Sequence, residues 1–292
     1  MRFAFLLLAT LVFGQEFTDI QVEKATGNHK YTDGPMWSKL LKGLLFCDAG
    51  NDTIQALLPG QGVAKFREDM GGASGLAYAP DGSIVVTEIK ERRLVRLIPG
   101  EAKKMEVVAD RFEGKRFNGP NDLAVRRDGH IFFTDPAFGP AGEKRELDFS
   151  GVFHVTPKGE VSVVAKPQGR PHGIVLSPNG RQLYVANADE RKIYLYDLDG
   201  KGIASNERVF VDKVDGVPGG LRLDEKGNLY IAANDVLIYS SQAKLLHRIH
   251  LQEKPSNLAF GEADHMTLFI TAKTSIYRAR MKVKGVVSES SQ

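Results

Sequence analysis

The chain of 292 residues has one cysteine, Cys47, so it cannot form an intramolecular disulfide. Cys47 lies inside an apolar run, where we expect a buried structural thiol. The fold must therefore be stabilised by burial of an apolar core. A chain of this length can bury enough surface to do so without covalent links.

The sequence also lacks a strong charge excess. Its formal net charge is +3, and no basic cluster has the density that nucleic-acid binding requires. No glycine-rich phosphate loop leads from a strand pattern into a helix pattern, and no serine stands in a nucleophile elbow. We therefore expect no nucleic-acid partner and find no motif for nucleotide binding or serine hydrolase chemistry.

Long hydrophobic runs are missing beyond the N-terminus. Arg2 followed by the apolar run 3–13 has the layout of a secretory signal, and the run is too short to span a bilayer. We expect residues 1–14 to be a signal peptide and 15–292 to form one domain. The mature protein would be secreted or periplasmic and would have no membrane anchor.

The rest of the chain repeats one pattern of two strands joined by a turn. Six segments begin with a short apolar stretch, and most then reach a pair such as Asp128-Gly129, which suits a tight hairpin. A second stretch follows, rich in β-branched and aromatic residues. The six first strands are expected in 34–37, 74–82, 121–129, 172–180, 219–227 and 256–264. The six second strands are expected in 44–48, 84–88, 131–135, 183–187, 229–233 and 268–272.

The repeats recur about every 40 to 50 residues, the length of one four-stranded blade. No long amphipathic helix pattern interrupts them. The sequence therefore predicts an all-β fold, a six-bladed β-propeller with antiparallel four-stranded blades around a central channel. We expect strands from both ends of the chain to share the closing blade, because such a ring leaves no open edge.

Aligning the first strands reveals a mostly polar column where each strand begins. A proline precedes four of its members and suits the entrance of a strand rather than its middle. In a propeller these positions would meet around one mouth of the channel. The column consists of Asp33, Ser74, Asn121, His172, Gly219 and Ser256.

Three members of this column could bind one divalent cation. Asp33, Asn121 and His172 offer a carboxylate, an amide oxygen and an imidazole. Alternatively, these side chains only cap strand ends and line a wet pore. The remaining histidines show no metal-ligand spacing, so we expect surface or turn positions for His130, His154, His247, His250 and His265.

The sequence resembles the SMP-30/gluconolactonase/LRE family of six-bladed propeller hydrolases. The similarity covers nearly all of the expected mature chain and is carried by the blocks 33–37, 114–139, 170–187, 218–232 and 255–272. Members of this family typically hydrolyse lactones, and a divalent cation, usually calcium, sits in their channel. The resemblance therefore implies a small lactone or ester substrate and one divalent metal ion.

The family's metal ligands correspond to the column, with departures. Asp33 stands where a glutamate is usual, Asn121 matches, and His172 stands where an asparagine is usual. Gly219 replaces an aspartate that the family uses as a ligand and as the probable general base. Because an imidazole binds calcium poorly, His172 favours zinc, another transition metal, or no metal.

The resemblance and the residue chemistry together suggest roles for the mouth. With Gly219 in place of the aspartate, the general base could be His172 or Asp122, with Asp33 as a further option. Arg116 and Asn118 resemble family positions near the substrate, and Asn121 would bind it as well. We expect a monomer. The alternative is a catalytically inactive propeller that binds a sugar-derived or peptide ligand in the same funnel.

Overall fold

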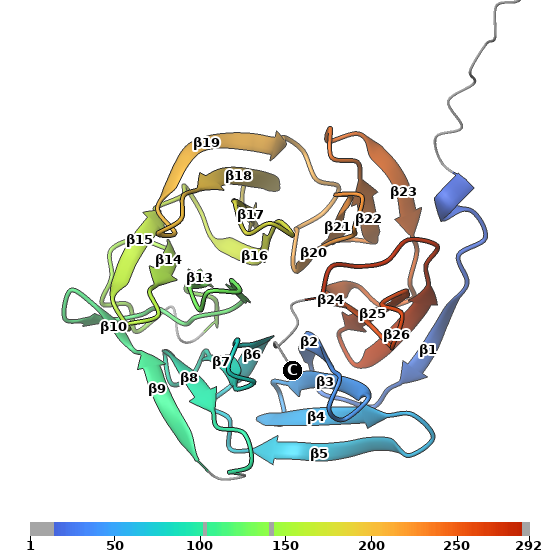
Figure 1. Cartoon of the computed structure of the whole chain (residues 1–292), viewed down its shortest axis with the longest axis horizontal. Coiled ribbons are helices and arrows are strands. Elements are labelled where there is room, and N and C mark those ends of the chain that lie inside the picture. The colour runs from blue at the N-terminus through green and yellow to red at the C-terminus, as the bar shows by residue number, and fades with distance from the viewer. Residues whose placement is uncertain (1–14, 102–103, 140–142, 288–292) are drawn as a thin grey trace, which may run out of the picture.

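The computed structural model describes residues 15–101, 104–139 and 143–287, and these fold almost entirely into β-strands arranged as a ring (Figure 1). The signal peptide predicted for residues 1–14 lies outside the described residues. A short 3₁₀ turn, η1 (Gln15–Phe17), precedes the first strand. No helix in these ranges is long and apolar enough to cross a membrane.

Six four-stranded antiparallel sheets form the blades, as the repeats predict. Blade 1 contains β2 (Thr32–Ser38), β3 (Gly43–Asp48), β4 (Thr53–Leu58) and β5 (Gly62–Glu68). Blade 2 contains β6 (Ala73–Tyr78), β7 (Ile84–Glu88), β8 (Arg93–Leu97) and β9 (Met105–Ala109). Blade 3 contains β12 (Leu123–Val125), β13 (Ile131–Asp135), β14 (Gly151–Val155) and β15 (Val161–Ala165).

Blades 4 to 6 follow the same order from the channel outwards. Blade 4 contains β16 (Pro171–Leu176), β17 (Gln182–Asn187), β18 (Lys192–Leu198) and β19 (Ala204–Val211). Blade 5 contains β20 (Leu221–Leu223), β21 (Leu229–Ala232), β22 (Val236–Tyr239) and β23 (Leu245–Ile249). Blade 6 contains β24 (Pro255–Gly261), β25 (Thr267–Ala272), β26 (Ser275–Arg280) and β1 (Val22–Thr26). A small hairpin, β10 (Arg111–Phe112) and β11 (Lys115–Arg116), lies between blades 2 and 3.

The ring closes through blade 6, as expected from the sequence. Strand β1 pairs antiparallel with β26, in a register that places Val22 opposite Ala279. The outermost strand of this blade therefore comes from the N-terminal part of the domain and the other three from the C-terminal part (Figure 1). The stacked aromatic rings of Trp37 and Phe269, 5.6 Å apart, join blades 1 and 6.

The second strand of every blade is buried on both faces. Strands β3, β7, β13 and β25 contain only buried residues, because neighbouring blades pack against both sides of them. Cys47 in β3 is fully buried and free, as predicted, and burial raises the pKa of its thiol. Such a thiol is inert rather than nucleophilic.

Acidic residues at the ends of second strands fix the loops that enter the first strands. Asp135 accepts hydrogen bonds from the backbone N–H groups of Asn118 and Gly119, at 2.8 and 2.6 Å. Asp48 does the same for Lys30 and Tyr31, both at 3.1 Å. These bonds hold the backbone just before the column residues, so the mouth of the channel is built on constrained loops.

One histidine expectation is wrong. His154 does not lie on the surface or in a turn: it is in the middle of β14 and only 1% exposed. Its ring stacks between Phe132 and His130, and its Nε2 lies 2.6 Å from Nδ1 of His130. Burial, with His130 beside it, lowers the pKa of His154 to about 4.

This pair predicts a loss of stability in acid. The native state keeps His154 neutral, whereas the unfolded chain takes up a proton near the ordinary pKa of 6.5. The contribution of neutral His154 to the free energy of unfolding is therefore fully present above pH 6.5 and is lost as the pH falls towards about 4. We expect the native protein to lose about 2 kcal/mol of unfolding free energy through this group, measured by urea denaturation. His154→Gln should reduce this slope with pH.

Candidate functional site

The six column residues meet in one ring at the mouth of the channel. Thr87 Oγ1 in blade 2 donates to the carbonyl of Asn121 in blade 3 at 2.7 Å. Thr134 Oγ1 in blade 3 donates to the carbonyl of His172 in blade 4 at 2.6 Å. The Ser256 hydroxyl in blade 6 donates to the carbonyl of Thr32 in blade 1, also at 2.7 Å. Neighbouring blades are thus hydrogen-bonded to one another where their first strands begin.

Two carboxylates from different blades lie together inside this ring. Asp33 is 6% exposed and Asp122 is 3% exposed, and the negative charge of Asp122 adds to the cost of ionising Asp33. Burial raises the pKa of Asp33 to about 7, opposed by a 2.8 Å hydrogen bond from Gly34 N–H. Burial also raises the pKa of Asp122, which accepts backbone N–H bonds from Leu123 and from Ile174 of blade 4.

Two residues that the sequence pattern did not indicate stabilise the charged form of these carboxyl groups. The Asn257 side chain in blade 6 lowers the pKa of both carboxyl groups by hydrogen bonding. The Arg222 guanidinium in blade 5 lowers both through its positive charge, and burial lowers its own pKa. Arg222 lies three positions after Gly219 in the aligned repeats. The other five repeats have an uncharged residue at that position, and this difference was the signal that the sequence offered.

The His172 ring is oriented by a backbone carbonyl group rather than by an acidic side chain. Its Nδ1 lies 3.0 Å from the carbonyl oxygen of Pro218, so that nitrogen carries the proton and Nε2 has the lone pair. The edge of Phe138 packs against the ring at 5.0 Å. Burial lowers the pKa of His172 to about 4, with further lowering by the cations Lys254 and Arg170. The imidazole is therefore neutral at neutral pH.

Gly219 has no room for the side chain that the family resemblance places there. A Cβ at this position would lie 2.4 Å from the carbonyl oxygen of Ser256, a distance that requires the backbone to move. The Gly219 N–H also donates to the carbonyl of Ala232 at 2.6 Å, which fixes the strand locally. The backbone at this point is built around a glycine.

We therefore expect Gly219→Ala to destabilise the protein by about 1–3 kcal/mol, because the added methyl group forces blade 5 away from blade 6. Urea denaturation would measure the loss. Gly200→Ala is the matched control, since a Cβ there meets nothing within 4 Å and its backbone is not left-handed. Equal stability of the two variants would contradict the tight approach at Gly219.

The other predicted substrate residues are engaged within the fold. Asn118 is fully buried, and its side-chain amide donates to the carbonyl of Phe149 at 2.9 Å, although its Oδ1 lacks a hydrogen-bond partner among the described residues. Arg116 lies in the β11 hairpin and donates to the Glu91 carbonyl. Asn121 donates to Ser74 Oγ at 3.2 Å, within the ring. Substrate binding by these three residues stays a prediction.

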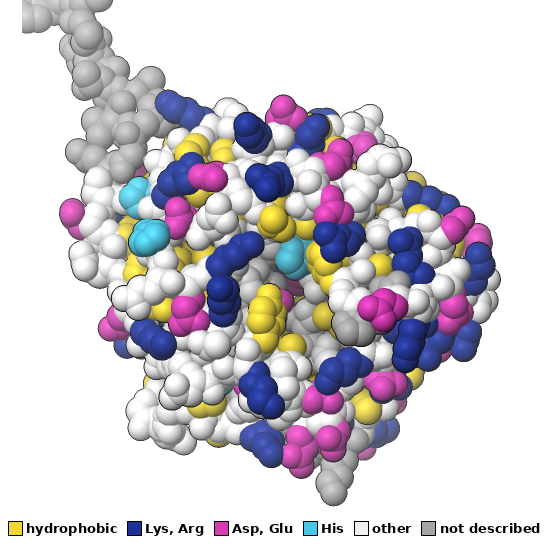
Figure 2. Space-filling view, turned by 180° about the vertical axis from the view of Figure 1, so that it is seen from behind, with side chains coloured by type: hydrophobic (Ala, Val, Ile, Leu, Met, Phe, Trp, Pro, Cys, Tyr) yellow, Lys and Arg dark blue, Asp and Glu magenta, His cyan; other side chains and the backbone are white. Residues whose placement is uncertain are grey.

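Figure 2 shows one face of the molecule with a hollow at its centre and Lys and Arg side chains gathered around it. Arg170 is one cation near the mouth: it is bonded to Asp189 and lies over the Phe138 ring at 4.9 Å.

Comparison with known proteins places this ring in a family. The family model for the SMP-30/gluconolactonase/LRE-like region matches residues 31–274. The chain belongs to this family. The gluconolactonase of Zymomonas mobilis is 30% identical over 90% of this chain and 82% of its own length. The structure of a gluconolactonase from Xanthomonas campestris superimposes with a TM-score of 0.85 at 25% identity, covering 91% of each chain. A calcium-binding protein, regucalcin, from Agrobacterium tumefaciens shares the SMP-30/gluconolactonase/LRE-like fold, with a TM-score of 0.76 at 18% identity over 90% of this chain and 94% of that one.

The donor set of this chain does not make a calcium site by itself. Within residues 15–101, 104–139 and 143–287, no three His, Cys, Asp or Glu side chains are grouped to hold a metal. Gly219 provides no donor, and Arg222 already supplies positive charge to Asp33 and Asp122. Calcium affinity falls as carboxylate ligands are removed. The predicted metal set of Asp33, Asn121 and His172 therefore stays a prediction.

Proposed function

We propose that this protein is a lactonase-type hydrolase that opens a small lactone or related ester at the mouth of the channel. The observation that carries the proposal is the ring itself, where Asp33, Asn121 and His172 begin three different inner strands of a gluconolactonase-like propeller. The positive charge around the mouth suits the carboxylate that ring opening produces.

In this mechanism His172 acts as the general base. The Pro218 carbonyl fixes the tautomer, so Nε2 can accept a proton from a water that attacks the carbonyl carbon of the substrate. The acyl C–O bond of the ring then breaks, and the protonated Nε2 returns the proton to the departing alkoxide oxygen, which leaves a hydroxy acid and neutral His172. No described residue donates a hydrogen bond to Nε2. An anionic group bound beside Lys254 would offset one of the charges that lower the His172 pKa, and so would strengthen the base. The Asn121 side chain would orient the substrate.

Turnover of a lactone panel by the purified protein tests the proposal, with measurements before and after chelator treatment and elemental analysis of the same sample. Hydrolysis of a lactone supports it, and chelator sensitivity would add a divalent metal to the mechanism. Absence of turnover by both metal-free and metal-supplemented protein would overturn it. We also propose that the protein works outside the cytoplasm, which fractionation of the expressing cells would test.

A second candidate is an inactive propeller that binds a sugar-derived or peptide ligand in the same mouth. The observation that favours it is Gly219, which replaces the family's aspartate and leaves no space for one. Saturable ligand binding without turnover would support this candidate.

A further inference from the structure

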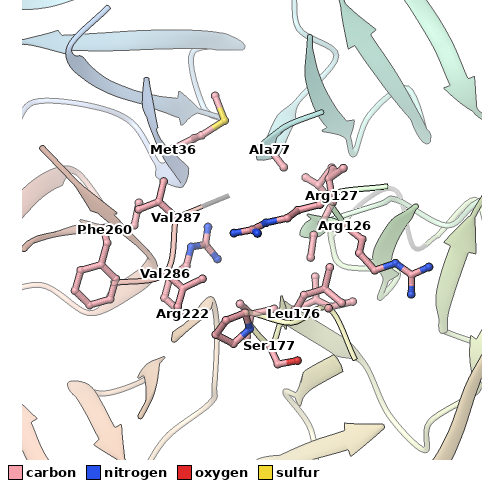
Figure 3. A pocket seen from close by; sticks show the side chains of 18 of the residues that line it. Met36, Ala77, Arg126, Arg127, Leu176, Ser177, Arg222, Phe260, Val286 and Val287 are labelled. Atoms are coloured by element: carbon pink, nitrogen blue, oxygen red, sulfur yellow. The ribbon is translucent and has the colours of Figure 1, made fainter. Parts of the chain in front are cut away.

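A second cavity lies at the opposite end of the channel, where the inner strands end. It has a volume of about 240 Å³ and lies below the size typical of a site for a drug-sized ligand. Its walls are mostly apolar and include Met36, Leu176, Phe260 and Val287 (Figure 3). Val286 and Val287, from the end of the described chain, also line the cavity, and the Val286 N–H donates to the carbonyl of Leu223 at 2.9 Å.

The charged residues of this cavity are all of one sign. Arg126, Arg127 and Arg222 line it, and no Asp or Glu does so among the described residues. Figure 3 shows the side chains of Arg127 and Arg222 pointing toward each other across the cavity, whereas Arg126 points away. Arg126 stabilises the fold and already has partners: it pairs with Asp128 at 2.8 Å and donates to the carbonyls of Asp199 and Gly200.

The two facing guanidinium groups differ in their surroundings. Arg222 is balanced from the channel side by Asp33 and Asp122. Arg127 is exposed and forms no ion pair with any residue in the described ranges. The charge of Arg127 therefore lacks a counter-ion among the described residues, and an anion bound between the two guanidinium groups would be stabilised chiefly by Arg127.

We propose that this cavity binds a small carboxylate with a hydrocarbon chain. Guanidinium groups match the planar geometry of a carboxylate, and the apolar walls would cover its chain. A polar hydroxy acid of the kind that lactone hydrolysis yields would leave its hydroxyl groups unpaired against these walls. The cavity is therefore distinct in ligand chemistry from the mouth, and the inference does not depend on the proposed hydrolase activity.

Calorimetric titration of the full chain with sodium hexanoate tests the proposal. Hexanoate should bind, whereas hexan-1-ol, which lacks the charge, and gluconate, which lacks the apolar chain, should not compete for the site. Arg127→Gln should weaken hexanoate binding about tenfold or more, because one charge-assisted hydrogen bond is lost. The matched control is Arg67→Gln on the outermost strand of blade 1, which should bind hexanoate as the native chain does.

Three outcomes would overturn the proposal: no hexanoate binding, equal binding by Arg127→Gln, or equal binding of hexan-1-ol. A variant that ends at Val287 tests whether residues 288–292, rather than an added ligand, occupy the cavity. Equal binding by this variant and the full chain supports the proposal. Binding only after removal of residues 288–292 would overturn it, because those residues would then be the occupant.

Discussion

His172→Ala should lower kcat/KM for lactone hydrolysis by about 10²–10⁴-fold, the usual contribution of a general base. The substitution removes the only imidazole in the column and leaves the backbone bond from Thr134 to residue 172 in place. The fold should therefore survive, and circular dichroism and urea denaturation would establish this. Steady-state kinetics on the best lactone of the panel measure the effect.

The pH profile separates a base from a residue that only shapes the mouth. For the native protein, kcat/KM should fall in acid with a midpoint near pH 4, where free His172 takes up a proton. The His172→Ala variant should lose this limb. His250→Ala is the control, because His250 is largely exposed and paired with Asp235. A loss of less than about threefold, or an unchanged acid limb, would contradict the assignment.

Arg222→Gln should lower the free energy of unfolding by about 3–5 kcal/mol near neutral or alkaline pH, because it leaves two buried carboxylates without their cation. The loss should shrink in acid. Burial raises the pKa of Asp33 to about 7 in the native state and also raises the pKa of Asp122, so protonation removes the charge of Asp33 as the pH falls below about 7 and removes that of Asp122 in acid. Urea denaturation at several pH values measures this dependence, and Arg67→Gln again serves as the control.

A double-mutant cycle shows whether the charge is responsible. Adding Asp122→Asn to Arg222→Gln should restore part of the lost stability, since only one buried carboxylate then remains. If the double variant is less stable than Arg222→Gln by the full cost of Asp122→Asn alone, the two side chains do not interact and the proposed compensation is wrong.

The sequence was most informative where burial sets the residue type. Strands β7 and β13 begin and end where the repeats predict, because both faces are buried and apolar residues dominate them up to the buried acidic residue at each end, Glu88 and Asp135. The repeats predicted four strands in each blade but did not locate the outermost strands β5, β19 and β23. Their side chains are mostly exposed or half-buried, so these segments carry no apolar pattern to recognise, and each pairs with the free edge of the third strand of its blade.

Within the site, the sequence predicted the ring but not its charge balance. Asp33 and His172 were identified because they recur at one position of the repeat. Arg222 lies three positions after Gly219, in β20, which pairs with β21 without a register shift. Asn257 lies one position after Ser256, where the pairing of β24 with β25 shifts register between Pro255 and Asn257. Such bulges depend on contacts between blades, which no single repeat reveals. For His154, the repeat could not show that a histidine would occupy a core position, since its partner His130 comes from the preceding strand's turn.

The pairing of β1 with β26 has a consequence for synthesis of the protein. Val22 leaves the ribosome long before Ala279, so the last sheet lacks its outer edge until nearly the whole chain has been made. During that interval β1 has no β26 to pair with, and the β26 of another copy of the chain could pair with it instead. Intermolecular exchange of this five-residue segment is thus the form of misassembly to which the architecture is most exposed.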